Sequence, residues 1–283
     1  MSARLMDPLP PVEVTRAQGA AGSVAAPALR RRGGKTEPAS AQLAAEVPIA
    51  LQYNGVSHAV MLATPCDLED FALGFSLSEG VIDTVPEFYG VEIEPARDGV
   101  TLAIDVASAA FARLKQRRRT LAGRTGCGIC GTESLDQVLR PLPALAARGP
   151  RIAAAALARA GDQLPQQQTL QQQTGATHAA AWCSPAGDVL CVREDVGRHN
   201  ALDKLIGALA RTRFDADSGF ALITSRASVE MVQKSAIVGI SVLVAVSAPT
   251  SLAVRVAEDC GQTLLGFARG DSFSVYAHGR RIT

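Results

Sequence analysis

The sequence predicts a mixed α/β fold, and the clearest sign of it lies in the C-terminal part of the chain. Nearly continuous apolar segments at 219–224, 240–247 and 263–268 alternate there with amphipathic stretches of about 12 residues. Strands of this kind belong to a sheet that helices cover on both faces. The hydrophobic content of 47% is enough for a substantial core. We therefore expect a three-layer α/β domain over residues 174–283.

A smaller mixed domain with hairpins is expected over residues 46–122. Two alternating apolar runs within 47–63 flank Asn54-Gly55, a dipeptide that tight hairpin turns prefer. Asp67 is placed to cap a following helix, and Gly80 is placed to end it. The other elements expected here are a strand pair over 90–106 and a helix over 108–119.

Three further segments differ from these domains in composition. Residues 1–45 are rich in Ala, Pro, Gly and Arg without a steady period, which indicates a disordered tail. Residues 136–173 indicate a helical connector followed by a Gln-rich segment, which fits a linker or a solvated helix; we expect the linker. Residues 123–135 form a glycine-rich segment with a Cys-x-x-Cys pair, and we expect a mobile loop.

Charge and hydropathy exclude some classes of partner. The formal net charge is +1, so the chain has no overall basic field to bind nucleic acid. No segment reaches the roughly 18 apolar residues of a membrane span, and the N-terminal residues lack the apolar core of a signal peptide. The arginines at 30–32 precede Gly-Gly-Lys, which argues against a twin-arginine signal. We expect a cytoplasmic protein that binds neither nucleic acid nor membranes.

Two of the six cysteines, Cys127 and Cys130, stand apart from the others. Glycines flank the pair, so the backbone can present sulfur to an outside partner. Basic residues upstream, including Lys115 and Arg124, favour the thiolate, which is the nucleophilic form. The pair therefore suits metal binding, disulfide exchange or carriage of sulfur as a persulfide. The cysteines in apolar stretches, expected to be buried, are Cys183, Cys191 and Cys260.

The residues alone leave these chemistries open. A structural zinc site needs about four ligands and the pair supplies two, although Cys66 and His199 could complete a site. A thioredoxin-like pair would lie at a strand end that opens a helix, usually without glycines on both sides. A purely structural loop also fits the pattern.

Six motifs together resemble the FdhD family of formate dehydrogenase accessory proteins, from about residue 46 to the C-terminus. They are TPCDLEDFALGFSLSEG (64–80), GRTGCGICG (123–131), TGATHAAAW (174–182), REDVGRHNALDKLIG (193–207), TSRASVEMVQKSA (224–236) and SAPTSLAV (247–254). The resemblance implies a C-terminal domain similar to the cytidine deaminases, and a homodimer. Deaminase chemistry itself is not expected, because the chain has neither H-x-E nor P-C-x-x-C.

The resemblance also implies a sulfurtransferase. Family members take sulfur from a cysteine desulfurase and pass it to the molybdenum cofactor, a bis-molybdopterin guanine dinucleotide, on behalf of formate dehydrogenase. The family cysteine that carries the persulfide matches Cys127, and the second loop cysteine matches Cys130. The cofactor is then a bound substrate, and no permanent cofactor or metal is expected. A non-catalytic cofactor-binding chaperone and a zinc-dependent interaction module are the alternatives.

Cofactor contacts are expected at three places in the C-terminal domain. Arg198 and His199 precede a helix, while Ser225 and Arg226 follow a buried strand, and both kinds of position suit anions. A capped helix start with solvated charges would fit them too. The family's cofactor contact matches a glycine-containing turn with an arginine, which suits phosphate but also fits an ordinary turn between strands. That turn consists of Phe267, Ala268, Arg269, Gly270, Asp271 and Ser272. We assign no role to His178.

Overall fold

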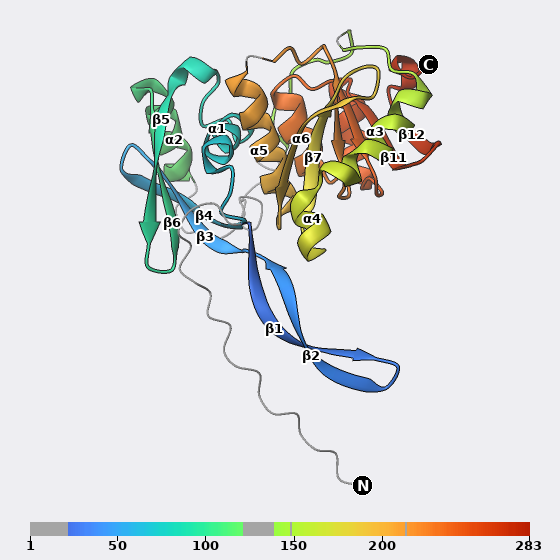
Figure 1. Cartoon of the computed structure of the whole chain (residues 1–283). Coiled ribbons are helices and arrows are strands. Elements are labelled where there is room, and N and C mark those ends of the chain that lie inside the picture. Colours follow the sequence, from blue (N-terminus) through green and yellow to red (C-terminus); the bar gives the residue numbers. More distant parts are fainter. Residues whose placement is uncertain (1–21, 121–138, 148, 213) are drawn as a thin grey trace.

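A computed structural model describes residues 22–120, 139–147, 149–212 and 214–283 (Figure 1). The Cys127-x-x-Cys130 segment lies outside these residues. The described strands form a two-stranded, a four-stranded and a six-stranded sheet. The predicted mixed α/β class is therefore confirmed. None of the helices in these ranges is long and apolar enough to cross a membrane.

The four-stranded sheet and the helix α1 make the N-terminal core. The turn between the first two strands forms at Asn54 and Gly55, which both have positive φ, as the dipeptide predicted. Buried side chains such as Leu51 and Leu102 of the sheet pack with Phe71 of α1. The sheet order is β4-β3-β6-β5. The elements are β3 (Val47–Tyr53), β4 (Val56–Ala63), α1 (Leu68–Ser78), η1 (Val85–Glu87), β5 (Phe88–Ala96), β6 (Gly99–Val106) and α2 (Ser108–Thr120).

The six-stranded sheet has the order β12-β11-β10-β9-β7-β8. Strands β9, β10 and β11 are parallel, and the others are antiparallel to their neighbours. The strands are β7 (His178–Cys183), β8 (Val189–Asp195), β9 (Phe220–Ile223), β10 (Val242–Ala245), β11 (Thr263–Arg269) and β12 (Ser272–Ala277). The helices are α3 (Ala154–Gln167), α5 (Arg198–Arg211), α6 (Val229–Ile237), α7 (Ser251–Cys260) and the short η3 (Gly279–Arg281).

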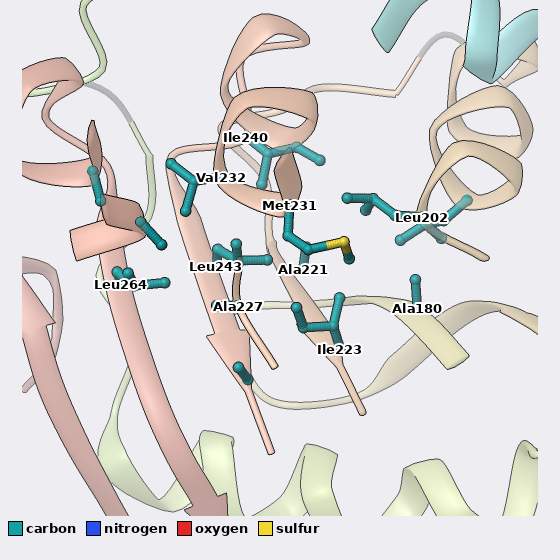
Figure 2. Close-up of a cluster of buried hydrophobic side chains, with 14 of the residues drawn as sticks. Ala180, Leu202, Ala221, Ile223, Ala227, Met231, Val232, Ile240, Leu243 and Leu264 are labelled. Carbon is teal, nitrogen blue, oxygen red and sulfur yellow. The ribbon is translucent and has the colours of Figure 1, made fainter. Parts of the chain in front are cut away.

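Helices cover both faces of this sheet, as the continuous apolar strands predicted. Alternate residues of each strand point to opposite faces. One face packs against α5, α6 and α7, and Figure 2 shows Leu202 of α5 and Met231 of α6 near Ile223 of the sheet. The other face packs against α3, whose Leu157 and Leu164 are buried beside the strands. The three-layer arrangement is therefore confirmed, although α3 precedes the residues 174–283 over which we expected the domain.

The two cores meet where α1 packs on α5. Glycines allow this close approach. A Cβ atom added to Gly74 would lie 1.7 Å from the Asp203 carbonyl oxygen, and one added to Gly207 would lie 1.9 Å from the Asp70 carbonyl oxygen. Helix α5 therefore contacts both the six-stranded sheet and the N-terminal core.

Two predicted unstructured segments are regular in the structure. The expected disordered tail (1–45) contains the hairpin of β1 (Ser23–Arg32) and β2 (Lys35–Ala44), which projects from the body in Figure 1. Its turn is made by Gly33 and Gly34, both with positive φ, a hairpin signal that the Ala-rich composition concealed. The expected Gln-rich linker continues as helix α3 and then α4 (Thr169–Thr174). Both expectations were wrong for these residues.

Candidate functional site

The loops that follow β8, β9, β10 and β11 lie at the same end of the six-stranded sheet. We call this end, formed by the carboxyl ends of these strands, the carboxyl edge. Strand β8 runs in the same direction as β9, because each is antiparallel to β7. The loop after β9 is held to the loop after β10, since Ala227 N donates to Ala248 O and Thr250 N donates to Ala227 O. The loop after β10 also contacts β11, because Phe267 N donates to Ser247 O. Ligands of α/β sheets commonly bind at such an edge.

The carboxyl edge brings together all the described residues that we expected to contact the cofactor. Arg198 and His199 begin α5 after β8, and Ser225 and Arg226 lie between β9 and α6. Residues 267–272 cover the end of β11, the turn at Gly270 and Asp271, and the start of β12. The structure therefore gathers three clusters that are far apart in the sequence.

Arg198 and His199 have nitrogen atoms that lack partners. Arg198 Nε and His199 Nε2 are buried, and neither forms a hydrogen bond with any described residue. His199 Nε2 lies 4.0 Å from a carboxylate oxygen of Glu230, which begins α6. Burial, followed by the positive charge of Arg198, lowers the pKa of His199 to about 4, so its imidazole is neutral at pH 7. Buried polar atoms without partners are rare, and they indicate a site that a ligand completes.

The segment 267–272, from the end of β11 to the start of β12, is strained and exposed. Phe267 has a φ of 55°, which is uncommon for an aromatic residue, and 48% of its surface is exposed. The pairing of β11 with β12 is irregular between Gly266 and Arg269, as in a β-bulge. Arg269 Nε donates a 3.3 Å hydrogen bond to the Val246 carbonyl, which ties this turn to the loop after β10. Strain of this kind clusters at functional sites.

Other residues of the 193–200 motif have internal partners. Arg193 forms an ion pair with Asp70 at 2.8 Å. Asp195 accepts hydrogen bonds from Thr64 N and Asn200 Nδ2 and lies 2.7 Å from Lys204 Nζ. The carboxylates of Asp70 and Asp195 therefore hold the two cores together, and they are not free to bind a ligand.

Glu194 of the same motif holds α4 against the sheet. Its carboxylate accepts hydrogen bonds from the backbone of Leu170 and Gln171 and from the hydroxyl of Thr177. Asp67 also differs from its predicted role. Its φ is 53°, its side chain does not cap α1, and it lies 3.7 Å from Arg193.

A second buried network lies between α1, α5 and α6. Lys234 Nζ lies 2.8 Å from carboxylate oxygens of both Asp203 and Glu79. Burial raises the pKa of Glu79, but Lys234 and Arg140 outweigh it and lower that pKa to about 2. Arg140 pairs with Glu79 and donates to the Ser78 carbonyl. No sequence pattern indicated this network, because its members are separated by up to 156 positions.

The described cysteines are poor nucleophiles. Burial raises the pKa of Cys66, Cys191 and Cys260, and it raises that of Cys183 to about 12. All four are free thiols. Within the described ranges, no group of three or more His, Cys, Asp or Glu side chains is arranged to hold a metal ion.

The fold and the carboxyl edge together define the class of this protein. It is a two-core α/β protein with a candidate anion-binding site at the carboxyl ends of its strands. A model of the FdhD/NarQ family matches residues 44–283, and the chain belongs to that family. It is 60% identical over 240 residues to the sulfur carrier protein FdhD of Variovorax paradoxus (strain S110), covering 85% of this chain and 86% of that protein.

Two further comparisons agree. The sulfur carrier protein FdhD of Cupriavidus necator (strain H16) is 57% identical over 253 residues, which cover 89% of this chain and 88% of that protein. The crystal structure of a protein assigned as a formate dehydrogenase accessory protein from Desulfotalea psychrophila superposes with a TM-score of 0.71. That match covers 92% of this chain and 99% of the other at 22% identity, so it supports the fold.

Proposed function

We propose that this protein takes sulfur from a cysteine desulfurase as a persulfide on Cys127 and transfers it to the molybdenum cofactor of a formate dehydrogenase. The observation that carries the proposal is the extent of the similarity: relatives named sulfur carrier proteins are 57% and 60% identical over at least 85% of the chain. The protein acts as a homodimer in this proposal, as the family resemblance implies.

The thiols of the described residues support Cys127 and Cys130 as the carriers. Sulfur exchange proceeds through a thiolate, so its rate depends on the thiolate fraction and on access. Burial raises the pKa of all four described cysteines, which leaves them mostly protonated at neutral pH. The glycine-flanked pair is therefore the best remaining candidate.

The transfer steps balance in atoms and electrons. The Cys127 thiolate attacks the outer sulfur of the donor's persulfide, the donor's S–S bond breaks, and the donor leaves as a thiolate. Cys130 then attacks the inner sulfur of the Cys127 persulfide. This step forms a Cys127–Cys130 disulfide, and the sulfane sulfur leaves as sulfide, which becomes the terminal ligand of the metal. An external thiol later reduces the disulfide.

The carboxyl edge is the proposed docking place for the cofactor. Arg198 and Arg226 offer guanidinium donors, which match the geometry of phosphate oxygens. His199 is neutral at pH 7 and offers a ring nitrogen without desolvating a charge. A non-catalytic chaperone is the second candidate function, because these residues could hold the cofactor without any thiol chemistry.

Intact-protein mass spectrometry separates the two functions. The purified chain is incubated with a cysteine desulfurase and cysteine, and we expect an adduct of about 32 Da that a reducing thiol removes. The adduct should be absent from Cys127→Ala. It should accumulate in Cys130→Ala, because that variant cannot release the sulfur.

Cys66→Ala is the matched control, since it removes a thiol whose pKa is raised, and it should keep the full adduct. Because Cys130 can release the sulfur in the wild type, the contradicting result is an unmodified Cys130→Ala variant, which would favour the chaperone. An adduct that persists in Cys127→Ala would assign the sulfur to a different cysteine.

A further inference from the structure

An apolar pocket of about 940 Å³ opens where the two cores meet. Its walls come from the end of α1, from η1 and its neighbours, and from the residues at the ends of α5 and α6. Val85 is 40% exposed, and Phe88 and Val238 are half-buried. Apolar side chains that gather at the surface around a cavity mark a site for a ligand or for another protein. The apolar lining includes Leu77, Ile82, Val85, Phe88, Phe214 and Val238.

Helix α2, which precedes the Cys127-x-x-Cys130 segment, is tied to one wall of this pocket. Arg113 of α2 lies 3.0 Å from a carboxylate oxygen of Asp83, which lines the pocket, and 2.9 Å from one of Glu87. From Arg113 to its end at Thr120, the helix rises about 10 Å. Cys127 follows Thr120 by seven residues, so it lies within about 25 Å of the end of the helix. A protein seated in the pocket is therefore within reach of Cys127.

The polypeptide that follows the cysteine segment is held at the same pocket. The described chain resumes at residue 139, and Arg140 pairs with Glu79 and donates a 2.9 Å hydrogen bond to the Ser78 carbonyl oxygen. Pro143 lines the pocket itself. The chain therefore enters and leaves the cysteine segment beside this one surface.

The pocket lies at the opposite ends of α5 and α6 from the carboxyl edge. Helix α5 begins with Arg198 at that edge, and Ala210 in its last turn lines the pocket. The 14 residues of α5 span about 20 Å, so the two sites are separated by about that length. Helix α6 runs in the same way, from Glu230 beside His199 to the lining residue Ile237. A protein at the pocket and a cofactor at the edge can therefore be bound at the same time.

We propose that this pocket binds an apolar segment of the cysteine desulfurase and so brings the donor's persulfide within reach of Cys127. The inference rests on the proposed function, which requires a sulfur donor and places the cofactor at the carboxyl edge. A few apolar side chains that fill pockets anchor most protein interfaces. The pocket supplies such an anchor point next to both ends of the cysteine segment.

Persulfide loading of the full-length chain from two different donors tests the proposal. All variants carry Cys130→Ala, so that the adduct accumulates. One donor is a purified cysteine desulfurase with cysteine, at a limiting concentration of the enzyme. The other is free cysteine persulfide, which needs no docking: its outer sulfur passes to the Cys127 thiolate, its S–S bond breaks, and cysteine leaves as a thiolate.

Val85→Glu places a carboxylate in the apolar contact, so loading by the desulfurase should slow at least about tenfold. Loading by cysteine persulfide should keep its rate, because Cys127 is untouched. The urea midpoint of unfolding should not change, since Val85 is already exposed. Val238→Gln, at the end of α6, should slow desulfurase loading in the same direction without adding a charge. Val60→Glu is the matched control, since Val60 is an exposed valine outside the pocket, and it should load normally from both donors.

Equal loading of Val85→Glu and its parent by the desulfurase would overturn the proposal. Equal slowing with both donors would also overturn it, because the effect would then lie on the thiol and not on docking. So would a change of oligomeric state in Val85→Glu, measured by light scattering, which would assign the pocket to a second copy of the chain. If the parent takes sulfur from neither donor, the sulfur-carrier function fails and the inference fails with it, so the two failures give different results.

Discussion

Two arginines five positions apart, Arg193 and Arg198, show how one motif serves two purposes. Arg193 is paired with Asp70 of α1, so it joins the two cores. Arg198 has a buried Nε that no described residue satisfies, and it lies at the carboxyl edge. The difference shows that internal partners, rather than residue type, separate structural charges from charges available to a ligand.

The same division applies to the neighbouring side chains. Below the carboxyl edge, Asn200 Nδ2 donates a hydrogen bond to Asp195, and Lys204 forms an ion pair with the same carboxylate. His199 at the edge has a ring nitrogen without a hydrogen-bond partner in the described part of the chain. Changes below the edge should therefore lower stability, and changes at the edge should lower ligand binding.

The largest effect is expected for Lys204→Met. Lys204 and Asp195 have fully buried side chains, so the substitution leaves Asp195 as a buried carboxylate without its cation. We expect the free energy of unfolding to fall by about 3–5 kcal/mol, measured by urea denaturation. The double variant Asp195→Asn with Lys204→Met should recover part of this loss. A loss below about 1 kcal/mol in the single variant would mean that this pair does not hold the cores together.

A pH-dependent effect of intermediate size is expected at His199. Its pKa is about 4 in the folded protein and about 6.5 when unfolded, so the unfolded chain binds the proton more readily. Stability should therefore decrease as the pH falls from about 6.5 to about 4, with a loss of about 2 kcal/mol between pH 7 and pH 5. Glu79 loses its stabilising charge only at lower pH, as its pKa is about 2.

His199→Gln should remove this part of the pH dependence, as shown by urea denaturation at pH 7 and pH 5. If the variant and the wild type lose the same free energy over that interval, His199 is not buried as a neutral ring.

The smallest change in stability is expected for Arg198→Ala. The free energy of unfolding should change by less than about 0.5 kcal/mol, because no hydrogen bond or ion pair of Arg198 with a described residue is lost. Binding of pyrophosphate should nevertheless weaken about tenfold or more, because a charge-assisted hydrogen bond to phosphate is removed. Arg193→Ala should show the opposite pattern, with lower stability and little direct effect on pyrophosphate affinity. Equal behaviour of the two variants would remove the distinction between the edge and the residues below it.

The sequence predicted the strands and helices of the larger domain well, because their apolar patterns are long and their turns contain glycine. It failed at β1, β2 and α4, where Ala-rich and Gln-rich composition hid regular structure. Amino-acid composition describes a segment as a whole. The turn at Gly33 and Gly34, and the packing of Ala26 and of Leu170, depend instead on single positions.

The edge residues were predicted as a group from their places after strands. The sequence did not predict that Arg193, Glu194 and Asp195 have internal partners, because those partners lie on distant elements such as α1 and α4. Cys127 and Cys130 lie outside the described residues, so their role stays a prediction.

The most direct test of the account is the formate dehydrogenase activity of cells that lack their own copy of this protein and express one of two variants. Cys127→Ala should fail to restore activity although the protein accumulates to the wild-type level, while Cys66→Ala should restore it fully. Full activity with Cys127→Ala would contradict the central claim that sulfur is carried on this cysteine.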